Sequence, residues 1–164
     1  MEIRYITQDD DRFAISRIYE ESWKFAYKDI IPESYLNSIP AGQWVSNLEK
    51  ADLNTLIMIE DDTYIGTSSF CKSRFAHLEG FGEIVSIYFL PDYIGRGYGK
   101  QMLKAVICEL AKLGYQDIFL WVLEENYSAR KFYEKFGFVQ KDKYLEDNIG
   151  GKKLREVLYC YHVE

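Results

Sequence analysis

The sequence has little proline, little cysteine and no long apolar run. Only 3 of its 164 residues are proline, and no stretch is rich in Gly, Ser or Pro, so we expect neither a disordered linker nor a low-complexity segment. The 3 cysteines are widely spaced and form no C-x-x-C pair, which indicates reduced thiols. Without a signal-peptide core or an 18-residue apolar stretch, we expect a cytoplasmic protein with no membrane partner.

Positive charge and histidine are also scarce. The chain has 20 Lys and Arg residues and 26 Asp and Glu residues, which gives a net charge of -6. This is opposite in sign to the charge of a typical nucleic-acid-binding protein, so we expect no nucleic-acid partner. The acidic excess favours cationic substrates such as amines, although it also serves solubility. His77 and His162 have no Cys or carboxylate at ligand spacing, so we expect no metal site and no Ser-His-Asp triad.

Apolar residues make up 48% of the chain, enough for one domain over residues 1–164 with a substantial core. The N-terminal half predicts a strand over 3–6, a helix from the acidic cluster at 9–11 to about Tyr27, and a short helix after Pro32. A hairpin turning at 61–62 follows.

The second half alternates strands with helices. We predict a central strand over 82–90, a helix over 98–113, a strand over 117–123, a short helix over 129–136 and a closing strand over 155–163. This order indicates an α/β layer fold with a mixed sheet.

The segment "DYIGRGYGKQ" sets three alternating glycines between an apolar strand and a helix. Without Cβ atoms, the backbone N–H groups of Gly95, Gly97 and Gly99 can turn toward one point, and the helix dipole with Arg96 or Lys100 adds positive potential. We therefore expect an anion there, the alternative being a tight turn with no ligand.

Two familiar phosphate loops do not fit this segment. A P-loop needs a longer spacing and a hydroxyl where Gln101 stands, and the dinucleotide pattern G-x-G-x-x-G needs its third glycine one residue later.

The loop resembles the acyl-CoA loop of the GNAT superfamily of N-acetyltransferases, whose pattern is Q/R-x-x-G-x-G/A. Gly97 and Gly99 match the two small positions, whereas Ile94 replaces the usual Gln or Arg. The segment "ENYSARKFYEKFGF" is similar to the family's later motif N-x-x-A-x-x-x-Y-x-x-x-G-F, with Asn126, Ala129 and Tyr133 in step. The resemblance covers nearly the whole chain and is weakest from residue 30 to 54.

The resemblance implies the superfamily's fold, a central, mixed, mostly antiparallel twisted sheet with helices on both faces. It also implies acetyl-CoA as cosubstrate, with the diphosphate held by the loop and the pantetheine arm added to a strand edge. The residues implied to bind the cosubstrate are Ile87, Tyr88, Phe89, Ile94, Gly95, Arg96, Gly97, Tyr98, Gly99, Lys100, Asn126, Ser128 and Arg130.

Two residues are candidates for catalysis. Tyr133 stands at the family's usual acid position, where a phenol can give its proton to the leaving thiolate; by spacing alone it is a core residue. Glu83 opens the strand "GEIVSIYFL" and alternates with Val85, Ile87 and Phe89, which makes it a candidate base or an ordinary solvated carboxylate.

Aromatic residues crowd the segment "ESWKFAYKDIIPESYL". Trp23 and Tyr27 are candidates for binding the acceptor, or are core residues at i, i+4 spacing. Asn126 and Arg130 also have alternative interpretations. Asn126 is equally expected as a helix cap, and Arg130 as a surface cation.

We therefore expect an N-acetyltransferase in which a primary amine, from a small molecule or a peptide, attacks acetyl-CoA directly in a ternary complex. A different class, an acyl-CoA sensor without turnover, is the alternative. The fold is also compatible with a homodimer.

Overall fold

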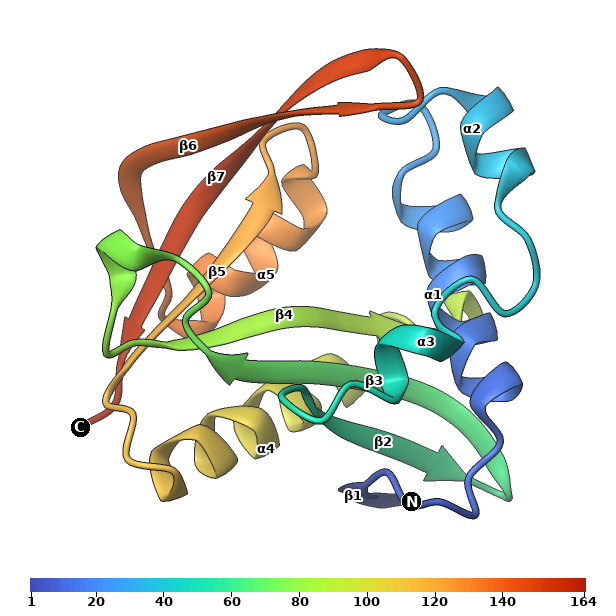
Figure 1. The fold of residues 1–164 in the computed structure, drawn as a ribbon, viewed down its shortest axis with the longest axis horizontal. Helices are drawn as coiled ribbons and strands as arrows, with labels where there is room; N and C mark the ends of the chain where they lie inside the picture. The colour runs from blue at the N-terminus through green and yellow to red at the C-terminus, as the bar shows by residue number, and fades with distance from the viewer.

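The structure, a computed structural model, describes all residues 1–164 and contains one seven-stranded sheet (Figure 1). The strands are β1 (Glu2–Tyr5), β2 (Asn54–Glu60), β3 (Thr63–Lys72), β4 (Gly82–Phe89), β5 (Asp117–Leu123), β6 (Val139–Ile149) and β7 (Lys152–His162). The α-helices are α1 (Arg12–Ala26), α2 (Glu33–Ser38), α3 (Val45–Leu48), α4 (Tyr98–Lys112) and α5 (Tyr127–Phe136). Single 3-10 turns occur at Ala76–Leu78 and Pro91–Tyr93.

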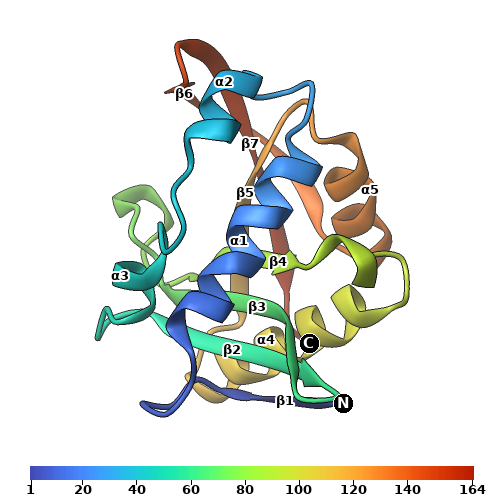
Figure 2. The same cartoon turned by 90° about the vertical axis from the view of Figure 1, so that its right-hand side faces the viewer.

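The strand order is β1-β2-β3-β4-β5-β7-β6, and each neighbouring pair is antiparallel except β4 and β5. Helices α1, α2 and α3 lie on one face of the sheet, while α4 and α5 lie on the other (Figure 2). The expected mixed, mostly antiparallel sheet with helices on both faces is confirmed.

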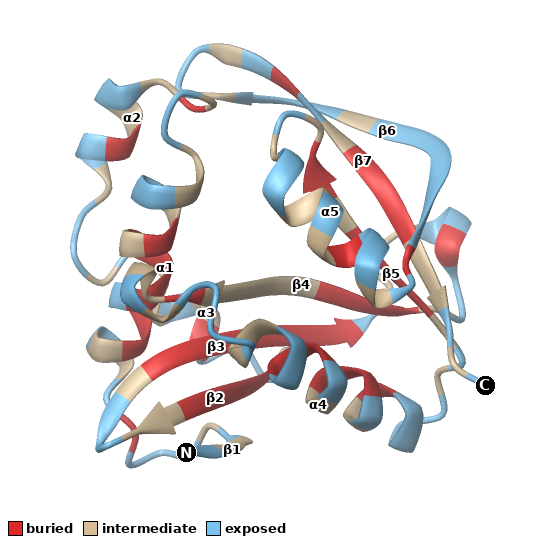
Figure 3. Cartoon of the chain, turned by 180° about the vertical axis from the view of Figure 1, so that it is seen from behind, coloured by how far each residue is buried: buried red, intermediate tan, exposed pale blue.

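The main core lies between the sheet and α4 with α5. It contains 18 buried residues, and α4 turns its apolar side inward, as the burial colours in Figure 3 show. Met102, Leu103 and Val106 on that side are fully buried, as their i, i+3, i+4 spacing predicts. Smaller clusters fill the other face, under α1 and α2.

Strands β4 and β5 pair only at their beginnings. The register joins Gly82 to Ile118 and Glu83 to Phe119, and no further pair follows. Beyond these residues the two strands diverge, as Figure 1 shows, so the β4 edge that faces β5 has no neighbouring strand. This opening in the sheet positions the candidate site.

A bulge in β4 changes which side chains share a face. The register with β3 moves from Ser69–Ser86 to Phe70–Ile84, which leaves Val85 as the additional residue. Ile84, Ile87 and Phe89 consequently pack together in the main core. The simple alternation of Glu83 with Ile87 and Phe89, expected from the sequence, is therefore wrong.

Strand β6 was not among the predicted elements. Nearly all of its side chains are exposed (Figure 3), because it is the edge strand next to β7 and its sequence "VQKDKYLEDNI" is rich in charge. The β6–β7 hairpin reaches the segment between α1 and α2. There Lys152 Nζ donates a 2.8 Å hydrogen bond to the carbonyl of Ile30. Gly150 lies so close to Tyr35 that a Cβ on it would be 2.6 Å from the Tyr35 Cβ.

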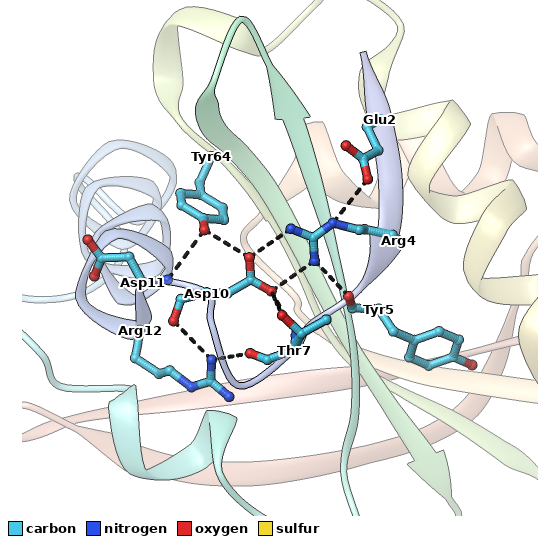
Figure 4. Close-up of polar contacts among 8 residues, drawn as sticks. All are labelled: Glu2, Arg4, Tyr5, Thr7, Asp10, Asp11, Arg12 and Tyr64. Carbon is cyan, nitrogen blue, oxygen red and sulfur yellow. Dashed lines mark hydrogen bonds and ion pairs between the residues drawn. The ribbon is translucent and has the colours of Figure 1, made fainter.

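A cluster of polar side chains fastens the N-terminus of α1 to the sheet (Figure 4). The Asp10 carboxylate accepts hydrogen bonds from both terminal nitrogens of Arg4, at 2.8 Å each, and from the Tyr64 hydroxyl at 2.8 Å. Asp11 caps the helix by accepting from the N–H groups of residues 13 and 14, as the acidic start of this segment predicts. None of the helices has the length and hydropathy needed to cross a bilayer.

Candidate active site

One cavity of about 860 Å³ occupies the opening between β4 and β5. It runs from the glycine loop at 94–100, along the free β4 edge and past α5, to side chains of α1, β5 and β7. The walls are mostly apolar, and Lys100 and Glu156 are the charged side chains that line it. The cavity is therefore lined by helices from both faces of the sheet.

The glycine loop has the geometry of an anion site. Gly95 and Gly97 have φ angles of +80° and +85°, a region that side chains with a Cβ rarely adopt. Gly97 is the cap residue of α4, and the backbone N–H groups of residues 95–100 donate no backbone hydrogen bond within the chain. These free donors at the positive end of α4 suit a diphosphate.

The side chains of the loop divide into two groups. Ile94, the three glycines and Lys100 line the cavity. Arg96 and Tyr98 do not: the Arg96 guanidinium lies 5.1 Å from the centre of the Tyr93 ring, and the Tyr98 hydroxyl donates to Glu60. These two side chains support the shape of the loop and do not line the cavity.

Helix α5 brings two of its three predicted cosubstrate residues to the cavity. Asn126 and Ser128 line it, and the Asn126 side chain also caps α5 by accepting from the Ala129 N–H at 3.3 Å. Arg130 points elsewhere, donating to the Tyr159 hydroxyl at 3.1 Å and to the Glu124 carbonyl at 2.8 Å. It therefore braces α5 against β5 and β7.

Tyr133 lines the cavity while most of its ring is buried in the main core, with 8% of the residue exposed. Burial, followed by the nearby Tyr88 phenol, raises the pKa of Tyr133 above its ordinary value. The hydroxyl therefore stays protonated at neutral pH, as a proton donor must be. The core interpretation and the catalytic interpretation are compatible here.

The three predicted β4 residues, Ile87, Tyr88 and Phe89, also line the cavity. The Tyr88 hydroxyl lies 3.1 Å from that of Tyr27 on α1, and burial raises the pKa of both, that of Tyr27 to about 12. Two neutral phenols thus join α1 to the free edge of β4.

Glu83 lies at the closed end of the opening, in the last residue pair that joins β4 to β5. Its side chain is 1% exposed and is held by Arg74, whose Nη2 and Nε donate at 2.6 Å and 3.1 Å. It does not line the cavity. This geometry gives the predicted base role no support, because the carboxylate is bound by Arg74 and is not part of the cavity wall.

Trp23 and Tyr27 do line the cavity, and their rings meet edge to face at 4.9 Å. They also pack against the cluster of Ile31, Leu36, Leu123 and Leu154, so they are both wall and core. The indole N–H groups of Trp23 and Trp121, both in the cavity wall, are buried without a well-formed hydrogen bond.

Sequence reasoning missed Trp121 and Glu156. Glu156 stands on β7 opposite Leu123, between Leu154 and Leu158 on the same face of the strand. Burial raises the pKa of its carboxyl, Asp147 raises it further, and Arg74 acts in the opposite direction. A charged residue between two apolar ones in "LREVL" was the available indication.

The cavity thus combines an anion-binding loop, a free strand edge and a protonated phenol. These three features fit a long, thin anionic ligand. Its reactive end would meet a second molecule at the aromatic wall formed by Trp23 and Tyr27.

Comparison with known proteins shows which family the chain resembles. Residues 13–138 match the Acetyltransferase (GNAT) family. The chain is 40% identical to the [Ribosomal protein bS18]-alanine N-acetyltransferase of Haemophilus influenzae, in an alignment that covers 71% of this chain and 97% of the relative. It is 27% identical over 93% of its length to the spermidine N(1)-acetyltransferase of Thermoplasma acidophilum, of which it covers 97%.

The crystal structure of the PaiA N-acetyltransferase from Thermoplasma acidophilum in complex with coenzyme A has the same fold. Its TM-score is 0.78 at 22% identity, over 99% of each chain. Together with the family match over most of the sequence, these similarities establish that the chain belongs to the Acetyltransferase (GNAT) family and is an N-acetyltransferase.

Proposed function

We propose that the chain, acting as one domain over residues 1–164, transfers the acetyl group of acetyl-CoA to a primary amine by direct attack in a ternary complex. The observation that carries this proposal is the single cavity lined by the glycine loop, by Tyr133 and by the aromatic side chains of Trp23 and Tyr27. A thioester is already activated, so the protein needs to orient two molecules and manage protons, and no nucleophilic side chain is required.

The loop and β4 hold the cosubstrate in this proposal. The free N–H groups of residues 95–100, with Lys100, receive the diphosphate. The backbone of residues 87–89 offers hydrogen bonds to the amides of the pantetheine arm, in the way an additional strand joins a sheet.

Tyr133 then acts as the general acid. As the carbon–sulfur bond breaks, its phenol gives a proton to the departing thiolate. Burial of the ring, followed by the nearby Tyr88 phenol, raises the pKa of Tyr133, which keeps the proton on its hydroxyl before the transfer.

The acceptor is a primary amine, bound between α1, β5 and β7. Two relatives support this class, since one bears the name of a ribosomal-protein alanine acetyltransferase and the other that of a spermidine acetyltransferase. Trp23 and Tyr27 offer aromatic faces to a cation or to its apolar stem.

The experiment has two parts. Coenzyme A at millimolar concentration should raise the melting temperature, because a ligand that binds only the native state stabilises it by mass action. Acetyl-CoA should then release free thiol with some member of a panel of polyamines, α-amino amides and peptides with free N-termini or lysines. A chain that shows neither the shift nor thiol release with any amine would contradict the proposal.

A further inference from the structure

The charges in the cavity are separated. Lys100 follows the end of β4 and belongs to the glycine loop, whereas Glu156 stands opposite Leu123 at the end of β5. Because β4 and β5 diverge, the positive and negative side chains lie across the opening from each other. The positive end suits the diphosphate, and the negative end has no assigned partner.

Glu156 differs from the other carboxylates that are withdrawn from solvent. Asp10 is bound by Arg4, Glu20 accepts from Ser16 and the Gly42 N–H, and Glu83 is bound by Arg74. Glu156 makes no hydrogen bond or ion pair, although it lines the cavity and is largely buried. A carboxylate without a partner in an apolar wall is costly, so a ligand that supplies a positive charge gains from it.

The groups around Glu156 do not supply that charge. Asp147 on β6 and Tyr27 on α1 bring a negative and a neutral group. Arg74, from the turn after β3, acts on Glu156 only through space and is itself bound to Glu83. The Glu156 carboxylate is therefore without a cationic partner, and it lines the cavity.

We infer that Glu156 receives the ammonium group of the acceptor and takes its proton, and that the acceptor is an amine with no carboxylate beside its nitrogen. The inference rests on the proposed function. An α-carboxylate would bring a second negative charge to this end of the cavity, where no lining side chain is positive. Peptide N-termini, α-amino amides and polyamines fit this charge pattern, and free α-amino acids do not.

The proton and electron pairs balance as follows. Glu156 takes one proton from the ammonium, and the freed nitrogen lone pair forms the bond to the thioester carbon. The carbon–sulfur bond breaks, and sulfur takes the proton of the Tyr133 hydroxyl. The remaining excess proton on nitrogen returns to the Tyr133 oxygen, and Glu156 releases its own to solvent, which leaves an amide, a thiol and one proton.

The test compares Glu156→Gln with Glu146→Gln, which removes the same charge from an exposed, ion-paired residue of β6 outside the cavity. With the best amine of the panel, Glu156→Gln should lower kcat/KM by about 10² to 10³ at neutral pH, the effect of losing one general base. The deficit should shrink as pH rises, because a free amine needs no proton acceptor. Glu146→Gln should behave as the parent.

Leucinamide and leucine test the charge pattern. The parent should use the amide at least about tenfold better than the acid, at a pH where the amine is protonated to the same extent, and Glu156→Gln should reduce this preference. Unchanged kcat/KM in Glu156→Gln, a deficit independent of pH, or a preference for leucine would overturn the inference while leaving acetyl transfer in place. A parent that acetylates nothing would overturn the proposed function itself, and this inference with it.

Discussion

Two carboxylates in this molecule are withdrawn from water in opposite ways. Asp10, at the start of α1, accepts hydrogen bonds from Arg4, Thr7 and Tyr64, and the bonds from Arg4 hold the pKa of its carboxyl well below the ordinary range. Glu156, in the cavity wall, accepts none, and burial raises the pKa of its carboxyl. Asp10, whose hydrogen bonds are all made within the chain, holds the start of α1 against the sheet. Glu156, which has no hydrogen-bond partner, is available to a ligand.

The contrast extends to the surrounding side chains. Around Asp10 the polar atoms are paired with one another (Figure 4), whereas the cavity contains unpaired loop amides, two indole N–H groups without partners and the Tyr133 hydroxyl. Unmet hydrogen-bonding capacity marks functional regions, because satisfying it within the chain would leave nothing for the substrate.

The largest expected effect is on the cavity side. Tyr133→Phe keeps the buried ring but removes the acidic proton, so turnover should fall by about 10² to 10⁴. Affinity for coenzyme A should stay within about threefold, because proton transfer matters in the transition state. Tyr161→Phe, which packs against the same core outside the cavity, is the control. A Tyr133→Phe enzyme with near-parent turnover would assign the acid role elsewhere.

A second change acts on binding. Gly97→Val places a β-branched residue at a φ of +85° next to the loop amides, so the thermal shift caused by coenzyme A should disappear. Gly114→Val carries comparable backbone strain, at a φ of +98° and with open space around it, but is remote from the cavity. If both variants lose the shift equally, strain rather than anion binding explains the loss.

A third change should affect folding alone. Asp10→Asn weakens the ion pair with Arg4, so the free energy of unfolding should fall by about 2 kcal/mol at pH 7, a moderate loss because Arg4 is partly solvated. Since the folded pKa of Asp10 is lowered, this difference is expected to narrow as the pH falls below about 4. The folded fraction should acetylate at the parent rate. Asp62→Asn, in the exposed turn after β2, is the matched control.

The smallest expected effect is on the free energy of unfolding when Glu156, rather than Asp10, is changed. Its folded pKa is raised, so the parent loses stability as pH rises from about 4.3, the value of an unfolded chain, through the folded value. Glu156→Gln lacks this loss and should be equal or more stable at pH 7, by at most about 1 kcal/mol, with no advantage below pH 4. Denaturant titration at both pH values measures it, and marked destabilisation at pH 7 would show that Glu156 is structural.

The sequence predicted those features that depend on the spacing of residues close together in the chain. The glycine loop, the cap at Asn126 and the inward position of Tyr133 depend on neighbouring residues and were all anticipated. Strand β6 was missed because an edge strand exposed on most of its residues has no apolar alternation.

The lack of structural support for Glu83 as the base has a different origin. Nothing in "GEIVSIYFL" reveals that Val85 forms a bulge or that β4 leaves β5 after Glu83. Nor does the sequence show that Arg74 occupies Glu83 while Glu156, 73 positions later, remains free. Such pairings are made by the fold and are visible only when distant segments are placed together.

The contact of the β6–β7 hairpin with the segment before α2 has a consequence for the order of assembly. Lys152 and Ile30 are 122 positions apart, so this contact closes one of the largest loops in the chain and has a high entropic cost. We expect this contact to form after the central sheet and to be among the first regions to open in the native state. Slow hydrogen exchange in β3 alongside fast exchange near Ile30 and Gly150 would show that this side of the cavity loosens while the fold persists, so that ligands of different size can enter.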